Sequence, residues 1–165
     1  MSRSRDDLAL WFQPKIAFFC AEAEHDGLPV KITRTLTTEL VQHAIWKVGR
    51  EELTNDEKVA LLAEGLFPDD LTKIKTNAAH AHETPHGIGL AIDCVPLKDG
   101  KLWWDAPDAV WERLYKIAER AGLDALGDKW GEYLSWDKGH FQEPGWRIYR
   151  PGGVWTKEPT HVSTA

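Results

Sequence analysis

Four stretches of the chain carry the apolar spacing or the terminal signals of a helix. Threonine side chains can cap two of them, because a hydroxyl oxygen accepts the free N–H groups of a first helical turn. Glycines that follow two of them supply the usual stop at the carboxyl end. The predicted helices cover residues 7–25 with an interruption near Pro14, Thr37 or Thr38 to about Val48, Thr54 to about Glu64, and Asp105 or Pro107 to Gly122.

Shorter apolar runs bounded by turn residues predict β-strands. The runs Leu28–Thr33 and Gly89–Val95 are predicted as strands, and Pro96 is expected to end the second. Residues 133–149 indicate strand and turn, whereas residues 76–88 show little periodicity and predict a loop. Because the regular rhythm of a parallel βαβ fold is absent, we predict an α+β domain. It would contain a small, mostly antiparallel sheet with helices packed on one side.

Composition narrows the class of protein without changing this picture. The chain has 165 residues, of which 42% are apolar and 28% charged, as in ordinary globular domains. We expect one domain over residues 1–150 and a polar tail over residues 151–165. A net charge of −6 argues against a dedicated nucleic-acid binder, which normally carries a basic stripe. No long apolar run predicts a membrane span, and a monomer is expected.

The two cysteines are not predicted to bind a metal. Cys20 and Cys94 lack the CxxC spacing of a cysteine-based zinc site. We expect both to be reduced and mostly buried thiols, since two cysteines make a disulfide scaffold improbable. Any metal site would therefore use histidines and carboxylates.

The predicted strand before Pro96 places one carboxylate where an ion could fit. Side chains alternate between the two faces of a strand, so Asp93 shares its face with Ala91 and Gly89 only. The larger apolar residues between them can face the core. His86 comes just before this strand and can fold back over the uncrowded face.

A second pair of candidate groups lies near the end of the chain. A turn at Lys138 and Gly139 would bring Asp137 and His140 close together. Two imidazoles and one carboxylate form a ligand set that catalytic zinc commonly uses, with water in the fourth position. A further carboxylate that is not a ligand can take the proton of that water and pass it to a leaving amine.

These residues lie in two motifs that resemble those of the M15 zinc peptidases. Residues 84–93 (TPHGIGLAID) resemble the motif S-x-H-x-x-G-x-A-x-D of that family. Residues 127–130 (GDKW) and 136–141 (WDKGHF) resemble its G-D-W…D-x-x-H-F-E/Q segment. The resemblance extends over residues 28–143. The family includes D-Ala-D-Ala carboxypeptidases, dipeptidases and the L-alanyl-D-glutamate endopeptidases of phage endolysins, and its fold is shared with hedgehog-like signalling domains.

The resemblance implies a role for each candidate residue. It implies that His86, Asp93 and His140 hold Zn²⁺ and that Asp137 is the general base and acid. The family also carries an arginine just after its first core strand, and Arg34 matches that position. Its guanidinium could bind a substrate carboxylate or stabilise a developing oxyanion.

Several nearby residues depart from the family motif or leave alternatives open. Thr84 stands where the family has serine and keeps the hydroxyl, while Pro85 stiffens the loop before the first histidine. His80 and His82 belong to an H-x-H-x-x-x-H run that could supply metal ligands by itself. Glu143 is a rival general base outside the matched motif.

The function expected from the resemblance is hydrolysis of peptidoglycan stem peptides by a zinc peptidase. An endolysin-like L-alanyl-D-glutamate endopeptidase is favoured, because aspartate at position 137 resembles the phage enzymes. The first residues lack the apolar stretch of a Sec signal peptide, so we expect synthesis in the cytoplasm and action on the bacterial cell wall after holin-type release. One alternative is a D-Ala-D-Ala carboxypeptidase of the same family. Another is a non-catalytic module that binds zinc.

Overall fold

The computed structural model describes residues 3–64, 66, 76–125 and 137–149 of the chain. Four α-helices, three short 3-10 helices and five strands lie within these ranges. In chain order they are η1 (Arg5–Asp7), α1 (Gln13–His25), β1 (Val30–Arg34), α2 (Glu39–Lys47), α3 (Asn55–Ala63), η3 (Ala81–Glu83), β2 (Ala91–Lys98), β3 (Lys101–Leu102), α4 (Asp108–Arg120), β4 (Asp124–Ala125), β5 (His140–Gln142) and η5 (Trp146–Tyr149).

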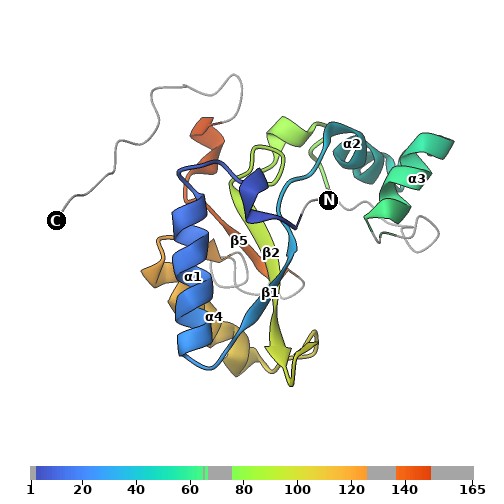
Figure 1. The fold of residues 1–165 in the computed structure, drawn as a ribbon. Helices are drawn as coiled ribbons and strands as arrows, with labels where there is room; N and C mark the ends of the chain where they lie inside the picture. The colour runs from blue at the N-terminus through green and yellow to red at the C-terminus, as the bar shows by residue number, and fades with distance from the viewer. Residues whose placement is uncertain (1–2, 65, 67–75, 126–136, 150–165) are drawn as a thin grey trace.

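The strands form one antiparallel sheet with the order β1-β2-β5-β4, and β3 pairs with the far end of β2. Helices α1 and α4 lie side by side against one face of this sheet (Figure 1). Fully buried side chains such as Phe19, Ile92, Leu114 and Phe141 join them into one core. This arrangement confirms the predicted α+β fold with helices on one side of a small sheet. Among the described elements, α1 and α4 leave the other face of the central strands uncovered (Figure 1).

Helices α2 and α3 pack on each other and lie beyond one end of the sheet (Figure 1). A separate small core around Ala44, Val48 and Leu61 holds them together. The predicted caps are present. The Thr38 hydroxyl accepts the N–H of the first turn of α2, and Thr54 forms a reciprocal capping box with α3.

Two boundaries near prolines show how local context decides a prediction. Pro14 stands in the first turn of α1, where its missing N–H costs nothing, so the residues before it form turns instead of helix. Pro96 was predicted to end its strand, and this is wrong, because it pairs with Val30 inside β2. The carbonyl of Pro96 accepts the N–H of Trp103, just beyond β3. The N–H that proline lacks would point to this same side of β2, so its absence affects only the short end of the β3 hairpin.

Some predictions lie outside the described residues. These are the motif at residues 127–130, Trp136 and the polar tail at 151–165. The extent of the single domain stays a prediction as well. None of the helices in the described part of the chain has the length and apolar character needed to cross a membrane.

Candidate metal centre

Three candidate residues form a row across neighbouring strands of the sheet. Arg34 on β1 pairs with Asp93 on β2, and Asp93 pairs with His140 on β5. Side chains of directly opposed residues in an antiparallel sheet point to the same face. The strand register therefore brings a guanidinium, a carboxylate and an imidazole together on the face that α1 and α4 leave uncovered.

A β-bulge is responsible for the position of the guanidinium. The register shifts between Ile32 and Arg34, so Thr33 is an extra residue in β1. Without this shift, alternation would turn Arg34 toward the opposite face. The Thr33 hydroxyl donates a hydrogen bond to the carbonyl of Asp93 at 3.2 Å and ties the irregular segment to β2.

A tight turn brings His86 back over the same face. A Cβ on Gly87 would lie 1.9 Å from the carbonyl oxygen of Ala81, so only glycine fits at this approach. Gly89 has a φ of 71°, which glycine adopts at little cost. The Thr84 hydroxyl donates to the Ala81 carbonyl at 2.9 Å and accepts the N–H of Gly87 at 3.0 Å. The hydroxyl that Thr84 shares with the family's serine therefore holds the loop in shape.

A second glycine allows the segment before β5 to approach β2. The Cys94 N–H donates to the Gly139 carbonyl at 2.9 Å, and a Cβ on Gly139 would lie 2.5 Å from the Cys94 carbonyl oxygen. This close contact positions His140 directly after it and Asp137 just before it. Cys94 itself is a buried free thiol, as predicted, and Cys20 is also free.

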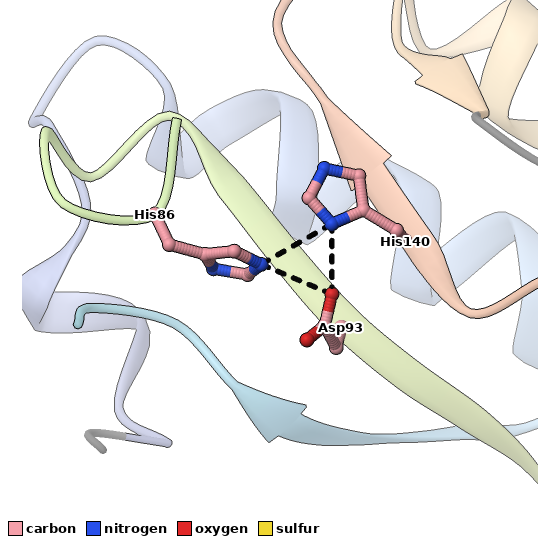
Figure 2. Close-up of side chains that lie close together, drawn as sticks. All are labelled: His86, Asp93 and His140. Carbon is pink, nitrogen blue, oxygen red and sulfur yellow. Dashed lines mark hydrogen bonds and ion pairs between the residues drawn. The ribbon is translucent and has the colours of Figure 1, made fainter. Parts of the chain in front are cut away.

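The two imidazoles and the carboxylate converge on one point (Figure 2). His86 Nε2 and His140 Nδ1 each lie 3.0 Å from Asp93 Oδ1, and the two nitrogens are 3.2 Å apart. The histidine side chains are 4% and 8% exposed, whereas that of Asp93 is 25% exposed. In the part of the chain that the structure describes, no other group of histidine, cysteine and acidic side chains has this convergence.

Each imidazole is held in the tautomer that a metal ligand needs. His86 Nδ1 lies 2.7 Å from the Thr35 carbonyl, and His140 Nε2 lies 3.1 Å from Oε1 of Gln142. A neutral ring that donates its N–H to such an acceptor leaves a lone pair on its other nitrogen. The lone pairs of the two rings then both point toward Asp93. A cation bound there would relieve the repulsion between these lone pairs and the carboxylate.

The charges in this cluster are strongly coupled. Burial alone would raise the pKa of Asp93, but the neighbouring His86 and His140 hold it well below its usual range. Burial lowers the pKa of His86. Burial also acts to lower the pKa of His140, but its hydrogen bond to Asp93 and the charges of Asp93 and Asp137 raise it. An anionic carboxylate beside two imidazoles is a ready ligand set for a divalent cation.

Asp137 lines the same cavity as Asp93 without belonging to the convergent group. Burial and the nearby charge of Asp93 raise its pKa, although His140 and Arg34 act in the opposite direction. A carboxylate with a raised pKa can both accept and return a proton near neutral pH. The guanidinium of Arg34 lies 3.5 Å from Asp93 Oδ2 and donates to the Thr37 hydroxyl at 2.7 Å, so it is fixed beside the site.

The remaining candidates lie elsewhere. The rings of His80 and His82 stack on each other with centroids 5.3 Å apart, and His80 Nδ1 contacts Oε1 of Glu39 at 2.5 Å. Glu143, the rival base, forms an ion pair with Lys15 at 2.7 Å. Alternation along β5 turns Glu143 away from the face that carries His140.

The donor set fits a catalytic zinc ion. Tetrahedral zinc has ligands at about 2.0–2.1 Å, which places any two of them about 3.4 Å apart. The three observed separations, 3.0 Å twice and 3.2 Å, are close to this value. Among the described residues three protein ligands converge here, whereas structural zinc sites are usually closed by four. Fold and site together define a metallohydrolase with an open coordination position.

Comparison with known families agrees with this class. Residues 77–143, which contain all three metal-binding candidates and Asp137, match the model of an M15 peptidase family described as D-alanyl-D-alanine carboxypeptidase. The chain is therefore similar to the M15 peptidases over this segment, and the metal cluster agrees with a zinc-dependent peptidase. No curated protein matches the chain significantly.

Solved structures with a similar fold include two of VanY type and one endopeptidase. A point mutant of the vancomycin-resistance D,D-pentapeptidase VanY from a VanB-type cassette, in complex with zinc, shares 20% identity over 88% of this chain and 79% of its own, with a TM-score of 0.52. The L-Ala D-Glu endopeptidase ChiX of Serratia marcescens shares 15% identity over 90% of both chains, with a TM-score of 0.50. VanYB in complex with D-alanine-D-alanine shares 21% identity over 86% and 76%, with a TM-score of 0.51. At these identities the similarity establishes the fold alone.

Sequence reasoning missed one supporting residue that a simple signal could have found. Gln142 stands two positions after His140 in a predicted strand, so the two side chains share a face. The Thr35 carbonyl and the bulge at Thr33 have no comparable signal, because both depend on the register of β1 against β2.

Proposed function

We propose that the protein cleaves the L-alanyl-D-glutamate bond in the stem peptides of peptidoglycan, and that it acts at the bacterial cell wall. This proposal rests on two cavities that lie on either side of Asp93. The large cavity, about 710 Å³, follows β1 and the β2–β3 hairpin, and the small cavity, about 350 Å³, leads to Asp137 and Trp111. Both are lined by Thr33, Asp93 and Trp104, so they meet beside Asp93, the carboxylate of the metal centre.

A groove that continues on both sides of the reacting centre is what an endopeptidase needs, because it must hold substrate residues before and after the scissile bond. The position of Trp104 supports the proposal of an endopeptidase groove. Its side chain is 66% exposed and lines both cavities, while the backbone beside it is anchored by the Trp103 N–H. An exposed indole at a groove offers a large apolar face to a substrate.

The substrate class follows from the family and from proteins of the same fold. The matched family model describes a D-alanyl-D-alanine carboxypeptidase, and ChiX is an L-Ala D-Glu endopeptidase. Both activities hydrolyse peptide bonds of peptidoglycan stem peptides. The aspartate at position 137, which resembles the phage enzymes of this family, favours the endopeptidase.

The residues at the site can divide the reaction between them. Zinc held by His86, Asp93 and His140 would supply Lewis-acid chemistry and lower the pKa of water to about 7. Asp137 accepts the proton of the attacking water and returns it to the leaving amine. Arg34, held by the Thr37 hydroxyl, offers a fixed positive charge to the oxyanion that develops on the substrate carbonyl.

A specific observation also favours a second candidate. The Arg34 guanidinium lies beside Asp93, where it could bind the terminal carboxylate of a D-Ala-D-Ala peptide. This arrangement would suit the carboxypeptidase that the matched family model describes.

Digestion of purified muropeptides separates the two candidates. The zinc-loaded protein is expected to release stem-peptide fragments that begin with D-glutamate, identified by mass spectrometry. Free D-alanine as the only product would overturn the endopeptidase proposal and establish the carboxypeptidase. Activity that survives exhaustive chelation would contradict both.

A further inference from the structure

The two cavities that meet at Asp93 differ in charge. The large cavity is lined by three cationic side chains, those of Arg3, Lys31 and Arg34, and by two acidic ones, those of Glu64 and Asp93. The small cavity is lined by two carboxylates, those of Asp93 and Asp137, and by one lysine, Lys138, whose amine already pairs with Asp108 at 2.5 Å. A peptide with acidic groups on one side of its scissile bond would therefore be bound in a preferred direction.

Among the two cations that the sheet contributes to the large cavity, Lys31 and Arg34, Lys31 is the one whose charge is more available to a substrate. Arg34 is occupied, because its guanidinium contacts Asp93 and donates to the Thr37 hydroxyl. No hydrogen bond or ion pair of the Lys31 amine is found within the described residues, and this side chain is exposed. A charge without a protein partner keeps its full capacity to bind a carboxylate.

The sheet register places Lys31 a short distance along the groove from the metal centre. Lys31 pairs with Val95, which stands two residues after Asp93 on the same face of β2. Two residues of a strand span about 6.6 Å. An extended substrate has the same spacing, so Lys31 can reach a group on the substrate residue next to the scissile bond.

We propose that Lys31 binds the free α-carboxylate of the D-glutamyl residue, so that the acidic part of the stem peptide occupies the large cavity. The inference rests on the proposed function and adds to it the direction in which the stem peptide lies across the metal centre. D-Glutamate in a stem peptide is joined to the next residue through its γ-carboxyl group, so its α-carboxylate remains free beside the L-alanyl bond. Lys31 is thus a specificity-determining residue, while the chemistry stays with the metal centre.

The test uses two synthetic stem peptides that differ in one group. One carries the free α-carboxylate on D-glutamate, and the other carries a carboxamide there. The zinc-loaded wild-type protein should prefer the carboxylate about tenfold in kcat/KM, mainly through KM, because a hydrogen bond to a charged group is lost in the amide. Lys31→Gln should remove this preference by lowering kcat/KM on the carboxylate peptide to about the value for the carboxamide, without loss of zinc.

Lys101→Gln is the matched control, because Lys101 is an exposed lysine of β3 that lines neither cavity. It should keep the wild-type preference. A Lys31→Gln protein that keeps the preference, or that loses rate equally on both peptides, would overturn the inference.

A binding experiment separates this inference from the proposed function. The zinc-loaded Asp137→Asn protein should bind both peptides while its turnover is about 10²–10⁴-fold slower, and calorimetry then gives the two dissociation constants with and without Lys31→Gln. Tighter binding of the carboxylate peptide that disappears with Lys31→Gln supports the role of Lys31, even if the wild-type protein cuts a different bond. Equal binding of the two peptides by the Asp137→Asn protein overturns it.

Discussion

Two groups of histidines in this molecule have opposite geometries. His86 and His140 meet edge to face, with an interplanar angle of 81°, and both side chains are buried. His43, His80 and His82 stack in a row, with interplanar angles of 23° and 11° between successive rings. Both groups are rich in imidazole, and both lie close to acidic side chains.

The difference explains why only one group can hold an ion. The lone pairs of an imidazole lie in the plane of its ring, so stacked rings direct them along parallel planes that do not meet. Perpendicular rings can direct them to one point, and the acceptors at Thr35 and Gln142 select the nitrogens that do so. A ligand set is therefore defined by convergence and fixed tautomers more than by the number of histidines in a stretch of sequence.

Alanine substitutions in the two groups should have contrasting effects. His86→Ala or His140→Ala should reduce zinc binding to below one equivalent and peptide hydrolysis by roughly a thousandfold or more, since the ion contributes several kcal/mol to transition-state stabilisation. Metal analysis after gel filtration and a muropeptide assay would measure both.

His80→Ala and His82→Ala are the matched controls for this experiment. They should keep full zinc content and activity close to that of the wild-type protein. Loss of zinc in either control would show that the stacked histidines take part in metal binding, and the comparison would fail.

The acidic residues near the two groups should also behave differently. Asp137→Asn should lower kcat by about 10²–10⁴-fold, because an amide cannot accept the proton of the attacking water, while zinc content stays constant. Glu83→Gln should change neither quantity, since the hydrogen bonds that Glu83 accepts within the described residues come from backbone N–H groups at the start of η3. A fully active Asp137→Asn protein would remove this residue from the mechanism.

A subtler change tests whether a fixed tautomer matters. Gln142→Leu removes the acceptor of the His140 Nε2–H and should weaken zinc affinity by about 10–100-fold, as competition with a chromophoric chelator would measure. Gln142→Glu keeps an acceptor at the same place and should retain most of the affinity. Equal affinities for the leucine and glutamate variants would mean that strand pairing alone orients the ring.

Local signals in the sequence were sufficient for much of the fold and for the face of β2 on which Asp93 lies. The caps at Thr38 and Thr54 mark the starts of two helices, and alternation in β2 assigns Asp93 to the face opposite the core. The glycine-rich turn after Thr84 is also a local feature. Such predictions succeed because each depends on residues only a few positions apart.

The features that escaped prediction depend on pairing between distant strands. The bulge that turns Arg34 toward the site exists only in the register of β1 with β2. Opposition of Asp93 and His140 depends on β5, which has three residues and too little pattern to fix a register. The prediction that Pro96 ends its strand was wrong for the same reason. A proline is tolerated inside β2 because the β3 hairpin ends beside it. The catalytic roles of Asp137 and Arg34 stay predictions.

The smallest expected effect concerns the pair formed by Glu39 and His80. A hydrogen bond and the charge of His80 lower the pKa of Glu39, and the hydrogen bond to Glu39 raises the pKa of His80. The histidine therefore contributes stability that is fully present below its unfolded pKa of about 6.5 and is lost as the pH rises through its raised folded pKa. The glutamate contributes stability that is present above its unfolded pKa of about 4.3 and is lost as the pH falls through its lowered folded pKa.

Both contributions coexist between about pH 4.5 and pH 6.5, so the pair should stabilise the protein most in this window. A double-mutant cycle with Glu39→Gln and His80→Asn, followed by urea unfolding, would measure the coupling free energy at about pH 5.5 and about pH 8.5. Because both side chains are more than half exposed, the coupling should be small at the lower pH and absent at the higher one. A coupling that persists at high pH, or one that alters zinc content, would mean that the stacked histidines do more than cover the surface between α2 and η3.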